Sequence, residues 1–172
     1  QSPIPNPLYL YKPYSYFSLL NKILKLIIIF ILIMVSCGIS PKDEQIKLYN
    51  ELKVDKAHRF LVFGLNKERN SLETFGVGKR EEGLKDLVSL LPNDDCRYVV
   101  YDFEYENFEN PPRATQKLLL FAWCPDNAPT KVKVPFTSIK SELISSFTGI
   151  QKTLQVADSS QLDFEELRKE CN

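Results

Sequence analysis

The stretch LPNDDCRYVVYDFEYE, Leu91–Glu106, decides the fold of this chain. In its second half Tyr101, Phe103 and Tyr105 alternate with acidic residues. Successive side chains of a β-strand point to opposite faces, so this alternation predicts a strand with one aromatic face and one acidic face. We expect the acids to form a polar, solvated face.

A second strand is predicted just downstream, where KLLLFAWC (Lys117–Cys124) is a short apolar run typical of a buried central strand. The intervening NFENPPRATQ (residues 107–116) contains two prolines and two asparagines and is typical of a turn. Two strands joined by such a turn form a hairpin. The centre of the predicted sheet is therefore this hairpin.

Other strands and helices are predicted before and after the hairpin in the sequence. RFLVFGL (Arg59–Leu65), SLETFGVG (Ser71–Gly78) and KTLQVAD (Lys152–Asp158) are further predicted strands. Leu84, Leu87, Val88 and Leu91 have helical spacing, and Pro92 is expected to end that helix.

Three more helices are predicted. Ser40 and Pro41 suit the N-cap and first position of a helix whose inner side carries Ile46, Tyr49 and Leu52. Phe136, Ile139, Leu143 and Phe147 lie on one side of a second, continuous helix that Gly149 stops. Asp163 and Glu166 form a capping pair for a C-terminal helix. Together these elements predict one α/β (α+β) domain, a mixed sheet of five to six strands flanked by helices on both faces.

Composition excludes several classes of function. Residues 1–33 hold three lysines and no acid, so the remaining residues carry a net charge of −3, which argues against nucleic-acid binding. Four scattered cysteines and one histidine do not make a zinc site, and we expect four reduced thiols and no metal. The GVGK motif at Gly76–Lys79 lacks the first glycine and the Ser/Thr of a phosphate-binding loop, so we interpret it as the end of a strand. No nucleophile has an evident base, and no cofactor is predicted.

The motifs DCRYVVYD, WCPDNAP followed by KVK, and FTSIKSEL followed by GIQ occur here in this order. In this order and spacing they make the chain resemble the actin-depolymerising factor/cofilin family, with its ADF-homology domain. The resemblance runs from about Cys37 to the C-terminus. It implies an actin-binding protein that is not an enzyme, binds actin monomers and filaments, and severs and depolymerises filaments. It also implies a monomer in the cytoplasm at the actin cytoskeleton, with the nucleus as a further location.

The resemblance assigns two surfaces. In the family the long helix contacts actin, and the residues of this chain that match the contact are Cys37, Gly38, Ile39, Lys131, Lys133, Lys140, Ser141 and Ile144. The positions that match the filament-only contact are Arg113, Lys117, Arg168 and Lys169.

Two departures from the family pattern affect regulation. Ile144 and Ser145 occupy the place of an adjacent basic pair that also binds phosphoinositides, so weak or no phosphoinositide binding is expected. Cys37 occupies the place of a serine that kinases modify in many members, and Ser36 beside it is a possible phosphosite. An alternative is therefore a protein of this fold that binds filaments or a regulatory complex without severing.

The first 33 residues form a segment of a different composition. They contain no Gly, Ala, Val, Asp or Glu, the residue types whose codons begin with G, as expected of translated non-coding sequence. The apolar run Leu26–Ser40 is shorter than the roughly 20 residues of a transmembrane helix. ILIMVSC also resembles a lipoprotein signal, which leaves a membrane-anchored or secreted lipoprotein as a further alternative. Since MVSCGIS matches the start of family members, we expect translation to begin at Met34 and the domain to span residues 34–172.

Overall fold

The structure is a computed structural model that describes Leu24 and residues 38–171. The predictions for Ser36, Cys37 and the start at Met34 lie outside the described residues, and they stay predictions. No helix within these described parts is long and apolar enough to span a membrane.

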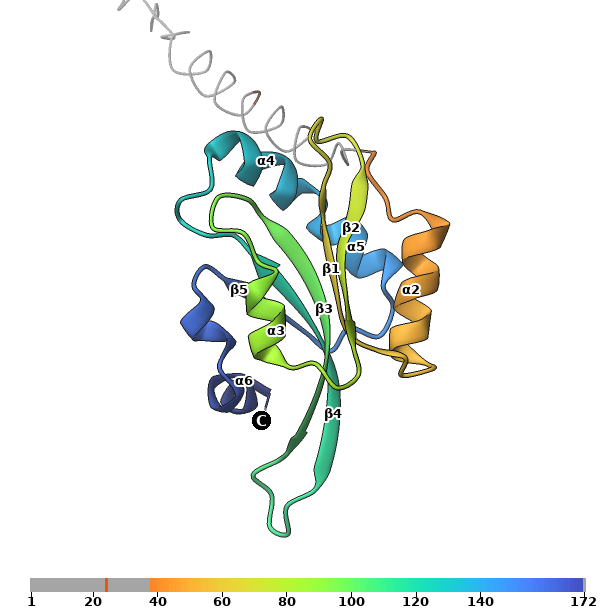
Figure 1. The fold of residues 1–172 in the computed structure, drawn as a ribbon, viewed down its shortest axis with the longest axis vertical. Helices are drawn as coiled ribbons and strands as arrows, with labels where there is room; N and C mark the ends of the chain where they lie inside the picture. Colours follow the sequence, from red (N-terminus) through yellow and green to blue (C-terminus); the bar gives the residue numbers. More distant parts are fainter. Residues whose placement is uncertain (1–23, 25–37, 172) are drawn as a thin grey trace, which may run out of the picture. The chain divides into compact units, whose positions relative to one another are not determined.

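Five strands form one mixed sheet in the order β2-β1-β3-β4-β5. The strands are β1 (His58–Leu65), β2 (Leu72–Lys79), β3 (Arg97–Glu106), β4 (Ala114–Trp123) and β5 (Lys152–Val156). The pairs β2–β1, β1–β3 and β3–β4 are antiparallel, and β5 pairs parallel with β4. The predicted hairpin is confirmed as the β3–β4 pair, which runs in register from Arg97↔Trp123 to Glu106↔Ala114 and projects beyond the other strands (Figure 1).

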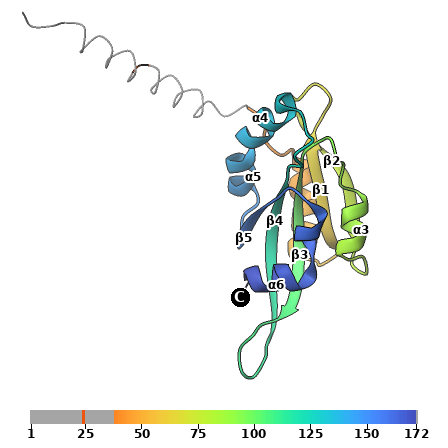
Figure 2. The ribbon, with the colours of Figure 1, turned by 90° about the vertical axis from the view of Figure 1, so that its left-hand side faces the viewer.

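Helices cover both faces of the sheet, as predicted (Figure 2). They are α2 (Asp43–Lys53), α3 (Leu84–Ser89), α4 (Thr130–Ser138), α5 (Lys140–Ser146) and α6 (Phe164–Cys171), with a short 3-10 helix η1 (Ser159–Leu162) before α6. One core cluster joins α2, α4 and α5 to the sheet, and the second joins α3, η1 and α6 to the opposite face. With both faces covered, β1 from Phe60 onward and the inner half of β4 are continuously buried rather than alternating.

Close packing explains a glycine of the GVGK motif. A Cβ on Gly78 would lie 2.3 Å from the Phe60 ring, so only glycine allows β2 to approach β1 here. The motif lies within strand β2 and not in a loop that could enclose a phosphate.

Local predictions about helix ends were wrong in two places, the start of α2 and the cap of α6. α2 begins at Asp43 with Lys42 as its N-cap, so Ser40 and Pro41 precede the helix. On its inner side Gln45 is buried, because its side chain bonds the Lys42 N–H and the Leu72 carbonyl. At α6 Asp163 accepts the Glu165 N–H, whereas the predicted capping partner Glu166 pairs with Lys169.

The predicted helix through Phe136 and Phe147 is broken into α4 and α5 at Ile139. Pro135 lies inside α4 and has no N–H to donate. Thr137 and Ser138 direct their hydroxyls at carbonyls four residues back, a bond that bends helices. The predicted inner residues are nevertheless buried on one side.

The predicted acidic face of β3 is also wrong in one part. The Asp102 side chain is fully buried, whereas Glu104 and Glu106 are exposed. Asp102 is enclosed because Arg80, Lys56 and Gln116 bring four hydrogen bonds to its carboxylate.

Candidate functional site: two basic surfaces of the domain

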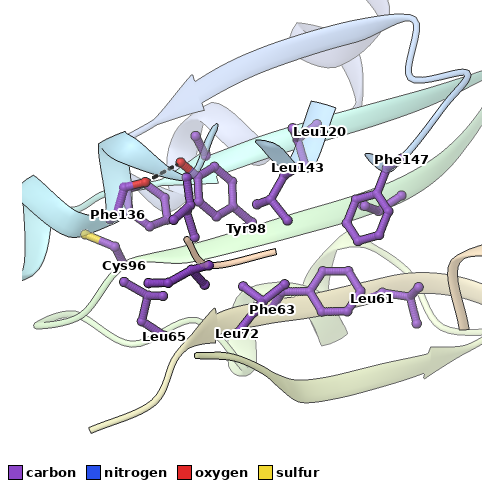
Figure 3. Close-up of a cluster of buried hydrophobic side chains, with 14 of the residues drawn as sticks. Leu61, Phe63, Leu65, Leu72, Cys96, Tyr98, Leu120, Phe136, Leu143 and Phe147 are labelled. Carbon is purple, nitrogen blue, oxygen red and sulfur yellow. Dashed lines mark hydrogen bonds between the residues drawn. The ribbon is translucent and has the colours of Figure 1, made fainter. Parts of the chain in front are cut away.

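Two hydrogen-bonded anchors hold α4 and α5 in place, one to strand β3 of the sheet and one to helix α2. The Tyr98 hydroxyl donates to the Phe136 carbonyl at 2.7 Å, and the two rings stack with centroids 4.0 Å apart (Figure 3). Because α4 ends at Ser138, that carbonyl is among the last four of the helix, which have no partner within it. Burial raises the pKa of the Tyr98 phenol, which therefore remains a donor.

The second anchor lies just beyond α5. The Thr148 carbonyl accepts hydrogen bonds from the Tyr49 hydroxyl at 2.8 Å and from Lys53 Nζ at 2.7 Å, both on α2. The Tyr49 ring stacks on Phe147 with a centroid distance of 4.6 Å. Burial raises the pKa of Tyr49 to about 12, so this hydroxyl also stays protonated at neutral pH. The two helices are thus fixed at the end of α4 and beyond the end of α5.

The outward side of these helices carries what we call the helix surface: Lys131, Lys133, Lys140, Ser141 and Ile144. Lys131, Ser141 and Ile144 are exposed, and Lys133 and Lys140 are half-buried. Lys133 donates to the Asp126 carbonyl at 3.1 Å, while Lys131 and Lys140 have no ion-pair partner among the described residues.

Apolar side chains accompany the lysines on the helix surface. Val134 is 62% exposed and lies one turn after Lys131, and Ile144 is 41% exposed and lies one turn after Lys140. Sequence reasoning did not assign Val134. Val132 and Phe136 have helical spacing and are buried, so Val134 between them must lie on the outer side of the helix. That spacing could have identified Val134 from the sequence.

Gly38 and Ile39 are arranged differently from the rest of the predicted contact. Gly38 is exposed and has a φ of +65°, a backbone conformation that favours glycine. The Ile39 side chain is buried in the same core cluster as Phe136. Ile39 therefore anchors the chain before α2 and does not present its side chain to a partner.

The second set of predicted residues meets where the β3–β4 hairpin passes α6, and we call it the hairpin surface: Arg113, Lys117, Arg168 and Lys169. The structure brings all four to this part of the domain, but they are not equivalent. Lys117 donates to the Cys171 carbonyl and lies 5.9 Å from the Tyr105 ring centroid. Arg168 donates to the Glu106 carbonyl at 2.7 Å and lies over the Phe108 ring at 4.3 Å.

These bonds mean that Lys117 and Arg168 join α6 to the hairpin. Arg113 and Lys169 instead expose most of their side chains, with Glu109 at 3.9 Å and Glu166 at 2.8 Å as their acidic neighbours. The outward charge of the hairpin surface is therefore carried mainly by Arg113 and Lys169. Phe108, 58% exposed, is an apolar residue of this surface that the sequence did not single out.

Both surfaces are built from basic and apolar side chains. Among residues 38–171 no group of three or more His, Cys, Asp or Glu side chains could hold a metal ion. The single histidine, His58, has its ring Nε2 3.3 Å from Glu51 and no nucleophile among its recorded partners. Two basic surfaces with exposed apolar side chains can bind an acidic protein.

Comparison with known proteins identifies the domain. Residues 38–172 match the family model described as cofilin/tropomyosin-type actin-binding protein. Actin-depolymerizing factor 6 of Arabidopsis thaliana is 32% identical over 135 residues, which cover 78% of this chain and 91% of that protein. Cofilin of Eremothecium gossypii is 34% identical over 131 residues, covering 74% and 88% respectively.

A solved structure gives the same result. The crystal structure of Streptomyces griseoflavus cofilin matches with a TM-score of 0.70 and 30% identity, covering 78% of this chain and 98% of that one. The chain therefore belongs to the family of cofilin/tropomyosin-type actin-binding proteins.

Proposed function

We propose that the protein binds both monomeric and filamentous actin and that it severs and depolymerises filaments. The observation that carries the proposal is the helix surface, where Lys131 and Lys140 each lie one turn before an exposed apolar side chain. The helices that carry them are anchored by Tyr98 and Tyr49. Proteins of this family act by binding actin and not by catalysis, so the chain is not an enzyme.

Two surfaces support two modes of binding. The helix surface would serve both forms of actin, and the hairpin surface would add a contact made only in the filament. A protein that binds one filament geometry better than another shifts the filament toward the favoured geometry. Severing would follow from that differential binding.

A second candidate function is filament binding without severing, alone or within a regulatory complex. Ile144 and Ser145 favour it, because they supply no charge at the centre of the helix surface. Filaments that bind the protein and keep their length would identify this function.

We further propose a monomer that works in the cytoplasm at the actin cytoskeleton. Phosphoinositide binding is weak in this proposal, because a phosphate needs a cation or an N–H donor that Ile144 and Ser145 lack. Nucleic acid is not a proposed partner, because the residues after 33 carry a net negative charge.

Reversal of charge on the helix surface tests the proposal. Lys131→Glu/Lys133→Glu should reduce co-sedimentation with actin filaments by about tenfold or more, because like charges across an interface are unfavourable. The melting temperature should not change, because Lys131 is exposed and Lys133 makes one surface hydrogen bond.

The matched control is Lys79→Glu/Lys85→Glu, which changes net charge equally at two exposed positions in and after β2. It should co-sediment like the unmodified protein. Equal binding by the Lys131→Glu/Lys133→Glu variant at physiological salt would refute the assignment of the helix surface.

A further inference from the structure

Two cysteines meet at the end of the β3–β4 hairpin that lies farthest from its turn. Cys96 precedes β3 and Cys124 follows β4, directly beyond the Arg97↔Trp123 pair. Their Sγ atoms are 3.3 Å apart, and both are free thiols. We propose that Cys96 and Cys124 form a dithiol site that a low-molecular-weight disulfide of the glutathione class oxidises reversibly to an intramolecular disulfide.

The hairpin register brings the two cysteines close together, because they come directly beyond the Arg97↔Trp123 pair and their sulfurs are 3.3 Å apart. Opposite residues of antiparallel strands have Cα atoms about 4.5–5.5 Å apart. Disulfides span Cα separations of about 4.4–6.8 Å, with sulfurs about 2.05 Å apart. The two sulfurs therefore need to approach by only a small side-chain movement, and the strand pairing can remain intact.

The third described cysteine cannot compete for either sulfur. Cys96 belongs to the core cluster drawn in Figure 3. Cys171 is buried in the other core cluster, on the opposite face of the sheet. The sheet separates them. An intramolecular bond within residues 38–171 is therefore possible only between Cys96 and Cys124.

Unequal burial sets the order of the reaction. Cys96 is 1% exposed, and Cys124 is partly exposed. The Cys124 thiolate attacks one sulfur of the small disulfide RSSR, forms a mixed disulfide and releases one thiolate RS⁻. The Cys96 thiolate then attacks Cys124 Sγ and releases the second RS⁻. In total the protein dithiol loses two electrons and two protons, and RSSR becomes two RSH.

The second step is the slow one at neutral pH. Burial raises the pKa of the Cys96 thiol, which is the attacking group of this step. Because the thiolate is the attacking species, ring closure accelerates as the pH increases. The titratable or charged groups around this sulfur are Cys124, Asp95, Arg97, Tyr98 and Lys133.

The bond would link the start of β3 to the end of β4, close to where the chain enters α4. Cys124 donates its N–H to the Val156 carbonyl at 2.8 Å, and the chain enters α4 six residues later. A cross-link here restricts the unfolded chain while leaving native strand pairing in place. Oxidation should therefore raise the melting temperature by several degrees.

The full chain, incubated in buffers of defined oxidised and reduced glutathione, tests the proposal by peptide mapping. We expect a Cys96–Cys124 cross-linked peptide that disappears with dithiothreitol, formed faster at pH 8.5 than at pH 7. Cys124→Ala, at the partly exposed position, should leave Cys96 unmodified. Cys96→Ala should instead accumulate a stable mixed disulfide at Cys124.

Cys171→Ala is the matched control, and it should form the cross-link like the unmodified protein. The proposal is overturned if no cross-linked peptide forms at any glutathione ratio. It is equally overturned if Cys124 retains glutathione while Cys96 stays a thiol, or if oxidation lowers the melting temperature.

Discussion

Asp102 is a single residue on which three separate segments depend. Its carboxylate receives hydrogen bonds from Arg80 Nη1 at 2.5 Å, from Lys56 Nζ at 3.4 Å and from Gln116 Nε2 at 2.5 and 2.6 Å. Arg80 follows β2, Lys56 precedes β1 and Gln116 lies in β4. A buried charge is tolerated when it is paired and hydrogen-bonded, and loss of one partner leaves the others unpaired.

Removing this carboxylate should therefore destabilise the domain strongly. Asp102→Ala is expected to lower the free energy of unfolding by about 3 kcal/mol, measured by urea denaturation. Glu104→Ala is the control, because Glu104 pairs with Arg59 and Arg80 from an exposed position and should change stability by no more than about 1 kcal/mol. Equal losses in the two variants would show that burial of Asp102 does not matter.

Ile144 and Ser145 lie where the resemblance to the family leads us to expect a basic pair. Full burial of an isoleucine contributes roughly 1.5–3 kcal/mol, whereas an exposed ion pair contributes about 0–1 kcal/mol. Ile144 is 41% exposed, so it has apolar surface left to bury against actin. We therefore expect actin binding to persist without a basic pair at these positions, and phosphoinositide binding to be weak because neither side chain offers a cation.

Ile144→Lys/Ser145→Lys should consequently raise binding to phosphoinositide vesicles by more than it raises binding to actin. The measurement is vesicle co-sedimentation beside filament co-sedimentation, with vesicles that lack the anionic lipid as the control. Strong vesicle binding by the unmodified protein would contradict this, and would place lipid binding on another patch such as Lys131 and Lys133.

Among elements, the break between α4 and α5 has a physical role. Ending α4 at Ser138 leaves the Phe136 carbonyl without a helical partner, and the Tyr98 hydroxyl supplies one from β3. The hydrogen bond fixes the junction between the two halves of the helix surface. A continuous helix would not offer that carbonyl to the sheet.

Tyr98→Phe keeps the stacked ring and removes only this donor. It should lower the free energy of unfolding by about 1–2 kcal/mol, because a buried carbonyl is left unsatisfied. Denaturant titration provides the measurement. Thr115→Val, which removes a hydroxyl from an exposed hydrogen bond in β4, should change stability little, and an equally small effect of Tyr98→Phe would contradict the anchoring role.

The hairpin and α6 form the second element pair with a proposed role. Lys117 donates a hydrogen bond to the Cys171 carbonyl, and Arg168 donates one to the Glu106 carbonyl. The outward charges to test are therefore Arg113 and Lys169. Arg113→Ala/Lys169→Ala should reduce filament binding and spare monomer binding, without a loss of stability. Equal loss for both forms of actin would contradict a filament-only contact.

The sequence predicted the strands well, because buried runs and alternation are local signals. The central hairpin, the helices on both faces and the mixed sheet followed from those signals and are confirmed. Helix ends were less predictable. Ser40 has the side chain of an N-cap, yet Gln45 bonds the Lys42 N–H, and this shifts the start of α2.

Contacts between residues far apart in the sequence could not be predicted from local patterns. Nothing local marks Asp102 as buried, because Arg80 is 22 residues away and Gln116 is 14 residues away along the chain. The meeting of Cys96 and Cys124 likewise depends on hairpin register. The resemblance to the family placed the candidate site residues. The structure adds that Lys117 and Arg168 bond backbone carbonyls, whereas Arg113 and Lys169 are largely exposed.

At the scale of the whole domain, one sheet separates two sets of helices and supports two distinct surfaces. The helix surface lies on α4 and α5, while the hairpin surface lies where the β3–β4 hairpin passes α6 on the other face. Two separated surfaces on one rigid domain allow contact with two neighbouring subunits of a filament. Binding of a filament geometry that bare filaments rarely adopt would then promote breakage.

Imaging of single fluorescent actin filaments tests this central claim most directly. Filaments anchored at low density should fragment and shorten within minutes of adding the protein, and Lys131→Glu/Lys133→Glu should leave them intact at the same concentration. Filaments that bind the unmodified protein but keep their length, or that do not bind it at all, would contradict severing by this protein.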